Sequence, residues 1–233
     1  MGEMLHVRDL NAWYGESHVL HGVDLSISDG EVVTILGRNG VGKTTTLRAI
    51  VGILRQRKGH ISFKGRDMIP VPLHRTARYG IGYVPEERGI FSTLTVEENL
   101  LLPPVVAGDG MSLDEIYALF PNLHERKTSP GTKLSGGEQQ MLAIARILRT
   151  GVDMLILDEP TEGLAPVIVQ RIGEVLKALK ERGMTILLVE QNFRFASKVT
   201  DHFYLMDHGE VVGQFPVQEL PDQMPMLNRV LGV

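Results

Sequence analysis

The sequence predicts an α/β fold: a largely parallel sheet with helices, an antiparallel β portion beside it, and an α-helical subdomain inserted into it. Three observations lead to this prediction. Short apolar segments alternate with amphipathic helical stretches, the first thirty residues alternate polar and apolar side chains, and a stretch rich in proline and glycine interrupts the middle of the chain. The length of 233 residues suits one large domain with a small insertion.

Three short segments have the nearly continuous apolar character of strands buried on both faces. They are residues 31–36 (Glu-Val-Val-Thr-Ile-Leu), 154–157 (Met-Leu-Ile-Leu) and 185–189 (Thr-Ile-Leu-Leu-Val). Between the last two, apolar residues from 168 to 179 recur with the helical period, and Gly183 suits the left-handed position that follows a helix. If these two strands share a sheet, they form one right-handed strand–helix–strand unit.

The first part of the chain differs from this pattern. Residues 5–13 and 19–27 roughly alternate polar and apolar side chains, and Tyr14-Gly15-Glu16 separates them as a turn. Alternation of this kind is typical of strands with one solvated face. We therefore expect an antiparallel pair of strands beside the parallel core.

The stretch from residue 88 to residue 133 has weak strand character. Within it, Thr95 and Glu98 have the spacing of a capping box, which predicts a short helix that ends before Pro103. We interpret this stretch as a helical subdomain inserted into the core. The expected organisation is a single domain over 1–233, with a core formed by 1–87 and 134–233 and the helical subdomain at 88–133.

The composition excludes several classes of protein. Hydrophobic residues at 43% and charged residues at 22% are ordinary for a soluble globular chain, and the net charge of −4 lacks the basic excess of a nucleic-acid binder. The 0 cysteines exclude disulfides, thiolate metal sites and a cysteine nucleophile. Charged side chains interrupt the N-terminal segment, and no apolar run approaches about 18 residues. We expect a cytoplasmic protein with peripheral membrane contact at most.

The strongest motif is Gly37-Arg-Asn-Gly-Val-Gly-Lys-Thr44, which follows a predicted strand and fits G-x-x-x-x-G-K-[ST]. Its glycines allow successive N–H groups to face phosphate oxygens, and the following helix adds its positive end. Lys43 would reach the β- and γ-phosphates, and the Thr44 hydroxyl would ligate Mg²⁺. The expected phosphate-binding residues are Gly37, Arg38, Asn39, Gly40, Val41, Gly42, Lys43, Thr44 and Thr45. A plain glycine-rich turn, the alternative, would not specify Lys-Thr.

A second motif places two carboxylates, Asp158 and Glu159, directly after the strand at 154–157. Ligands of open α/β sheets bind at the carboxyl ends of the strands. Asp158 suits coordination of Mg²⁺, directly or through water, and Glu159 suits polarisation of an attacking water. An isolated pair of this kind is more often a solvated turn, but the phosphate loop upstream favours the functional interpretation.

A third motif lies at residues 134–140, Leu-Ser-Gly-Gly-Glu-Gln-Gln. Ser135 and Glu138 have capping-box spacing, so a helix is expected to begin here and run to about Leu148. Gly136 and Gly137 at its mouth expose N–H groups that suit an anion. The motif therefore predicts either a second phosphate site or simply a well-capped helix.

In their order along the chain, these three motifs resemble those of ATP-binding-cassette (ABC) ATPases, and the resemblance covers nearly the whole chain. It implies a P-loop NTPase core of the RecA-like type that binds ATP and Mg²⁺. It also implies a head-to-tail dimer, in which residues 135–138 of one subunit close over the nucleotide held by Lys43 of the other. In this family Glu159 would be the catalytic base and Tyr14 would stack on adenine, although Tyr14 could be an ordinary half-buried tyrosine.

The sequence departs from the common family pattern at three positions. Glu86 replaces the glutamine that usually follows Tyr-Val-Pro, Gln191 replaces the switch histidine, and Ala165 replaces an aspartate. The resemblance implies that Glu86 lies near the Mg²⁺ and that Gln191 completes the catalytic set with Lys43 and Glu159. Together the three departures resemble the ATPases of branched-chain amino-acid importers, and urea and amide importers look similar.

The expected function is therefore that of an ATP-hydrolysing, energy-coupling subunit of a membrane importer, on the inner face of the cell membrane. The resemblance implies three kinds of partner: a second ATPase, identical or related; membrane-spanning permeases; and a periplasmic-type solute-binding protein. One alternative is a soluble cassette ATPase that acts on ribosomes or DNA. Another is a non-hydrolysing interaction module, which the intact Lys43 and Glu159 disfavour.

Overall fold

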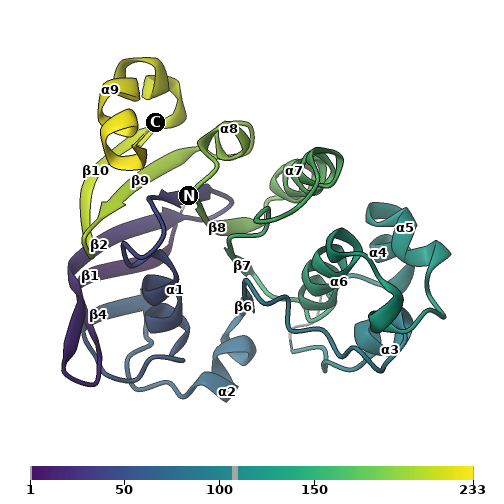
Figure 1. Ribbon diagram of the computed structural model, residues 1–233. Coiled ribbons are helices and arrows are strands. Elements are labelled where there is room, and N and C mark those ends of the chain that lie inside the picture. The colour runs from purple at the N-terminus through teal and green to yellow at the C-terminus, as the bar shows by residue number, and fades with distance from the viewer. Residues whose placement is uncertain (1, 107–109, 233) are drawn as a thin grey trace.

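The computed structural model describes residues 2–106 and 110–232, which fold around two sheets (Figure 1). The first sheet is antiparallel, with strand order β2-β1-β4-β5. Its strands are β1 (Glu3–Tyr14), β2 (Ser17–Ser28), β4 (Arg57–Phe63) and β5 (Arg66–Asp67). The expected pairing of β1 with β2 is confirmed. Within the two described ranges, no helix is both long and apolar enough to cross a membrane.

The second sheet has six strands in the order β10-β9-β3-β8-β7-β6. They are β3 (Val32–Leu36), β6 (Ile81–Val84), β7 (Met154–Asp158), β8 (Thr185–Glu190), β9 (His202–Asp207) and β10 (Glu210–Pro216). The three predicted parallel strands are β3, β8 and β7, adjacent at the centre of the sheet. Helix α7 (Pro166–Glu181) connects β7 to β8, and Gly183 after it has the expected positive φ of 80°.

The central strands divide their side chains between two apolar cores. Val33 and Ile35 of β3 face a core shared with helix α1 (Lys43–Val51) and the antiparallel sheet. Leu155 of β7 and Leu188 of β8 face the opposite core, which α6 and α7 cover. The remaining helices are α2 (Leu73–Thr76), α3 (Val96–Leu101), α4 (Leu113–Leu119), α5 (Pro121–Glu125), α6 (Gly136–Leu148), α8 (Phe193–Ala196) and α9 (Leu220–Leu231).

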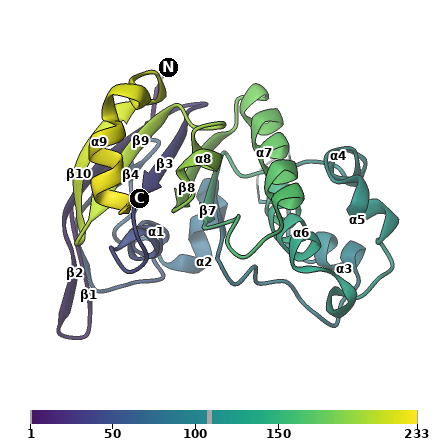
Figure 2. The same ribbon diagram turned by 45° about the horizontal axis from the view of Figure 1, so that its top comes forward.

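Helices α3, α4 and α5 occupy the predicted helical stretch, and α6 lies beside them in both views (Figures 1 and 2). The capping box of α3 is confirmed, because Thr95 and Glu98 each accept a hydrogen bond from the backbone of the other, and the helix ends before Pro103. Residues 107–109 of the stretch lie outside the described part of the chain. Since α6 packs against α3 and α5, we propose that the helical subdomain continues to Leu148 rather than ending at residue 133.

Neighbouring leucines of α3 provide a matched test of this packing. Leu100 is fully buried, whereas Leu101 is 51% exposed. Leu100→Ala should lower the free energy of unfolding by about 2–5 kcal/mol, because it removes apolar contacts and leaves a cavity. Leu101→Ala should change it by about 0.5 kcal/mol or less. Urea denaturation checks the difference, and equal losses for the two variants would contradict this placement of α3.

Candidate nucleotide-binding site

The phosphate loop spans residues 37–42, between the end of β3 and the start of α1. Gly42 has a φ of 112°, a conformation that side chains rarely adopt, and it leads directly into the helix. A Cβ on Gly37 would lie 2.6 Å from the carbonyl oxygen of Met206. Glycine is therefore required at both positions, for its backbone freedom at one and for its small size at the other.

Lys43 is buried at the start of α1, where its ammonium group has three oxygen partners. Its Nζ donates to the carbonyl oxygens of Gly37 at 2.9 Å and Arg38 at 2.8 Å. It also forms an ion pair of 2.9 Å with Oε1 of Glu159. An ammonium group has three donors, so its hydrogen-bonding capacity is filled. These contacts hold a positive charge directly under the loop.

Asp158, the last residue of β7, receives two hydrogen bonds from different elements. The Thr44 hydroxyl donates to Oδ1 at 2.8 Å, and the Tyr83 hydroxyl of β6 donates to Oδ2 at 2.9 Å. Burial raises the pKa of Asp158, and the hydrogen bonds from Thr44 and Tyr83 oppose that rise. The structure thus brings Thr44 and Asp158 together, and it adds Tyr83, which our sequence analysis missed.

Glu159 has a strained backbone, with a φ of 45°. Such a conformation costs a non-glycine residue about 1–3 kcal/mol and persists only where the surroundings impose it. Here the N–H of Glu159 donates to the Val189 carbonyl of β8 at 3.0 Å, and its carboxylate pairs with Lys43. Strain of this kind is typical of functional sites, where it fixes the direction of a side chain.

The oxygen groups at this site suit Mg²⁺. The Thr44 hydroxyl and the Asp158 carboxylate are hard oxygen donors that already touch each other. No group of three or more His, Cys, Asp or Glu side chains suited to a metal ion occurs among the residues described. Mg²⁺ commonly uses one or two protein ligands and completes its shell with phosphate and water.

Glu86 is exposed in the loop after β6. Burial, followed by the charges of Glu159 and Asp158, raises the pKa of the Glu86 carboxyl. The side chain therefore lies within electrostatic reach of the two strand-end carboxylates. Of the three expected metal ligands, Thr44 and Asp158 are in contact, and Glu86 is near them.

Gln191 and Tyr14 come from different elements, Gln191 from the segment after β8 and Tyr14 from the end of β1. Gln191 is exposed and directly follows Glu190, the residue that pairs with Leu36 where the phosphate loop begins. Tyr14, at the end of β1, is 45% exposed, as stacking on a base would require. Its hydroxyl lies near the Arg48 guanidinium of α1. Gln191 therefore follows the strand that pairs with β3, and Tyr14 lies near α1.

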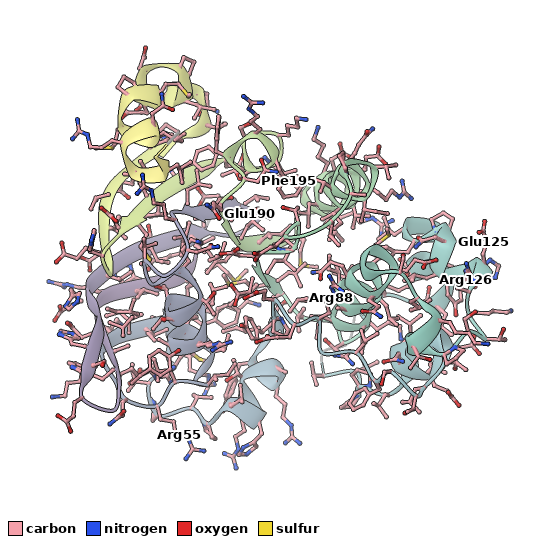
Figure 3. All side chains as sticks on the ribbon, viewed as in Figure 1. Arg55, Arg88, Glu125, Arg126, Glu190 and Phe195 are labelled. Carbon is pink, nitrogen blue, oxygen red and sulfur yellow. The ribbon has the colours of Figure 1, made fainter. Side chains whose placement is uncertain are left out.

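Residues 135–138 lie elsewhere, at the N-terminus of α6. The predicted capping box is confirmed: the Ser135 hydroxyl accepts from the Glu138 N–H at 3.3 Å, and the Glu138 carboxylate accepts from the Ser135 N–H at 2.7 Å. Two arginines flank this helix start, Arg88 beside Gly136 and Arg126 in a 3.6 Å ion pair with Glu138 (Figure 3). No hydrogen bond or ion pair among the described residues joins this segment to the phosphate loop of the same chain.

Comparisons with known proteins agree with this geometry. The family model described as "ABC transporter" matches residues 20–162. BraG of Pseudomonas aeruginosa, a high-affinity branched-chain amino acid transport ATP-binding protein, is 40% identical over 212 residues, which cover 90% of this chain and 91% of BraG. LivF of Archaeoglobus fulgidus, a probable branched-chain amino acid transport ATP-binding protein, is 35% identical over 99% of both chains.

A second group of relatives is nearly as similar. LptB of Acidithiobacillus ferridurans, a lipopolysaccharide export system ATP-binding protein, is 34% identical over 99% of this chain and 97% of LptB. Among solved structures, a nucleotide-free ATP-binding cassette from an ABC transporter matches with a TM-score of 0.85 and 25% identity, over 100% of this chain and 99% of the cassette. The chain therefore belongs to the ABC transporter family, as one of its ATP-hydrolysing ATP-binding subunits.

Proposed function

We propose that this ATPase is the energy-coupling subunit of a membrane importer for branched-chain or other hydrophobic amino acids. The observation that carries the energy-coupling part of the proposal is the convergence of Lys43, Thr44, Asp158 and Glu159 at the ends of β3 and β7, which suits ATP hydrolysis. The similarity to BraG and LivF supports the class of solute, as do the three departures from the common family pattern.

The proposed mechanism assigns each group a separate task. Lys43, once its ammonium group exchanges one or more of its present oxygen partners for phosphate oxygens, binds the phosphates together with the N–H groups of the loop, and Tyr14 stacks on adenine. Glu159 accepts the proton of the attacking water. Gln191 hydrogen-bonds the γ-phosphate, and its amide, unlike a histidine, carries no proton that titrates near neutral pH.

Thr44 and Asp158 are the proposed ligands of Mg²⁺, with Glu86 nearby as a further oxygen. The ion, when bound, supplies positive charge that offsets the charge developing on the phosphates. Without it, Glu86 and Asp158 would repel a polyanionic nucleotide, so the carboxylates at this edge make phosphate binding dependent on the cation.

The proposed working unit is a dimer, made with a second copy or a related ATPase. In it, residues 135–138 of one subunit contact the nucleotide held by the other. A dimeric cassette structure from a bacterial ABC transporter supports this, with a TM-score of 0.80 and 26% identity over 92% of this chain and 99% of that one. The two arginines beside the start of α6 add positive charge suited to phosphate.

The proposed permease contact is a groove of about 650 Å³ between the core and the helical subdomain. Its walls include exposed apolar side chains, Ile53 and Leu73, and the ring of Tyr83. Since the Tyr83 hydroxyl also bonds Asp158, a segment seated in this groove would act directly on a proposed metal ligand. This contact would hold the subunit at the inner face of the membrane, and a periplasmic-type binding protein would select the solute.

Export of lipopolysaccharide is the second candidate, because the LptB proteins match over nearly the whole chain. Urea or amide import, and action on ribosomes or DNA, are further alternatives. Uptake of radiolabelled leucine into cells of the source organism separates them. Replacing the chromosomal copy by a Lys43→Ala variant should reduce uptake to the level of a deletion strain, and lipopolysaccharide at the cell surface should not change. Normal uptake with defective lipopolysaccharide would contradict the import proposal.

Lys43→Ala also tests the phosphate site in the purified protein. The change removes the charge under the loop, so it should weaken ATP binding and reduce turnover about 100-fold or more. Phosphate release and titration with a fluorescent ATP analogue measure the two effects. Lys177→Ala, which removes a lysine from the exposed side of α7, is the control and should behave as wild type. Unchanged affinity and turnover in Lys43→Ala would refute the assignment.

Glu159→Gln tests the base and the dimer together. The amide keeps the shape of the side chain and removes both the base and a negative charge beside the γ-phosphate. ATP should then bind without being hydrolysed, and a dimer should accumulate in MgATP and dissociate in MgADP, as followed by size-exclusion chromatography. Adding Ser135→Arg should abolish that dimer, because it places a bulky cation at the start of α6. A monomer in both nucleotides would exclude an ATP-dependent homodimer, and a dimer that survives Ser135→Arg would place the interface elsewhere.

A further inference from the structure

Glu190 is a buried acidic residue to which the mechanism above assigns no task. It is the last residue of β8 and is 2% exposed. Strand alternation places it on the same face as Ile186 and Leu188, whose side chains lie in the apolar core under α7. Figure 3 shows it where the sheet meets the segment leading into α8. A carboxylate buried in such a place is costly unless hydrogen bonds satisfy it.

The hydrogen bonds of Glu190 reach two loops. Its Oε1 accepts from the Thr161 hydroxyl at 2.7 Å and from the Thr161 N–H at 3.3 Å. Its Oε2 accepts from the Asn192 N–H at 3.3 Å. Thr161 is two residues after Glu159, and Asn192 directly follows Gln191. One carboxylate therefore joins the loop that carries the proposed base to the loop that carries the proposed γ-phosphate contact.

We propose that Glu190 is a positioning residue for ATP hydrolysis. Through its hydrogen bonds to Thr161 and Asn192, it fixes the positions of Glu159 and Gln191 relative to each other. This inference rests on the roles proposed for Glu159 and Gln191. Glu190 touches neither of these side chains through a hydrogen bond, so it acts through the loops and not on the nucleotide.

The strain at Glu159 explains why this tie, meaning the hydrogen bonds of Glu190 to Thr161 and Asn192, is needed. Its φ of 45° is unfavourable, and the chain around it would relax if it were free to do so. The bond from the Glu159 N–H to Val189 fixes the residue on one side, and the bonds of Thr161 to Glu190 fix the chain on the other. Loss of the second fixation would displace the base, and a displacement of about 1 Å can cost 100-fold in rate.

The tie is strongest in the ionised form of Glu190, whose two oxygens accept all three hydrogen bonds. A proton on Oε2 would face the Asn192 N–H, and two donors cannot bond each other. A proton on Oε1 would be accepted by the Thr161 hydroxyl but would make Oε1 a weaker acceptor for the Thr161 N–H, so protonation at either oxygen weakens the tie. Burial raises the pKa of Glu190 to about 7, the bonds from Thr161 and Asn192 lower it, and the charge of Glu159 raises it. Glu159 is itself paired with Lys43. Charged side chains of α7 and of the segment around α8 line the groove outside Thr161 and Asn192: Glu174, Lys177, Arg194 and Lys198.

Glu190→Gln tests the tie, because the variant resembles the protonated residue at every pH. Wild-type kcat should rise as pH increases through about 7. The variant should lack this step, with kcat similar to wild type at pH 6 and about tenfold or more lower at pH 8.5, and with a KM for ATP within about threefold of wild type. Glu181→Gln, on the exposed end of α7, is the matched control and should keep the wild-type profile. The same step in Glu190→Gln as in wild type would overturn the proposal.

Stability separates positioning from a merely structural role. Because the pKa of Glu190 is raised in the folded protein, its contribution to stability is full below the ordinary pKa of glutamate and is lost as pH rises through about 7. The difference in Tm between Glu190→Gln and wild type should therefore favour the variant more at pH 8.5 than at pH 5.5. The activity of the variant should nevertheless be below that of wild type at pH 8.5. Loss of Tm and kcat together at both pH values would overturn the proposal in favour of a structural role.

Three variants test the contact with Thr161 and the role proposed for Glu159. Thr161→Val removes the hydroxyl that bonds Glu190 and should lower kcat, whereas Thr161→Ser keeps the hydroxyl and should restore it. Equal kcat for both variants would overturn the proposed tie. Glu159→Gln, assayed in parallel, should be inactive. If it hydrolysed ATP as wild type does, the proposed base would be wrong, which is a different result from an unchanged pH profile in Glu190→Gln.

Discussion

The ion pair between Lys43 and Glu159 joins two loops that leave the sheet from different strands. Lys43 follows β3 and Glu159 follows β7, and β8 lies between those strands. Both side chains are almost fully buried, at 3% and 9% exposed. A buried charge without a partner is strongly destabilising, so each side chain fixes the position of the other. The carboxylate of this pair belongs to the residue with the strained backbone, and the ammonium group also contacts two carbonyl oxygens of the phosphate loop.

The surrounding contacts extend the same arrangement to the rest of the molecule. Asp158 contacts helix α1 through the Thr44 hydroxyl and strand β6 through the Tyr83 hydroxyl. Tyr83 in turn lines the apolar groove between the core and the helical subdomain. A continuous chain of contacts therefore runs from the proposed metal ligands to the proposed permease contact. Movement of a partner in the groove and a change at the phosphates could influence each other through these few hydrogen bonds.

Features that depend on short stretches of sequence could be predicted. The central strands, α7 with Gly183 after it, and the capping boxes of α3 and α6 follow from periodicity and local chemistry, and all are present in the structure. Strand β4 was not predicted, because only Ile61 and Phe63 are buried in it and its first half has no apolar pattern. The packing of α6 with α3 and α5 depends on how distant segments meet, which no local pattern encodes.

The same distinction holds for the site. The phosphate loop and the strand-end carboxylates have a motif or a position in the sheet that identifies them. Tyr83 belongs to the Tyr-Val-Pro segment and Glu190 ends a strand, but neither position indicates which side chain the residue contacts. Tyr83 reaches Asp158 across 75 positions of sequence, and Glu190 reaches Thr161 across 29. An acidic residue that ends an otherwise apolar strand was the one sequence feature that could have drawn attention to Glu190.

A double-mutant cycle on the free energy of unfolding tests the pairing of Lys43 with Glu159 directly. The cycle compares wild type, Lys43→Met, Glu159→Gln and the double variant by urea denaturation. Lys43→Met should be the most destabilised, by about 3 kcal/mol, because it leaves the Glu159 carboxylate buried and unpaired. In the double variant no charge remains, so its loss should be smaller than the sum of the single losses by at least about 1 kcal/mol. Additive losses would show that the two charges do not hold each other in place and would contradict the central role given to this ion pair.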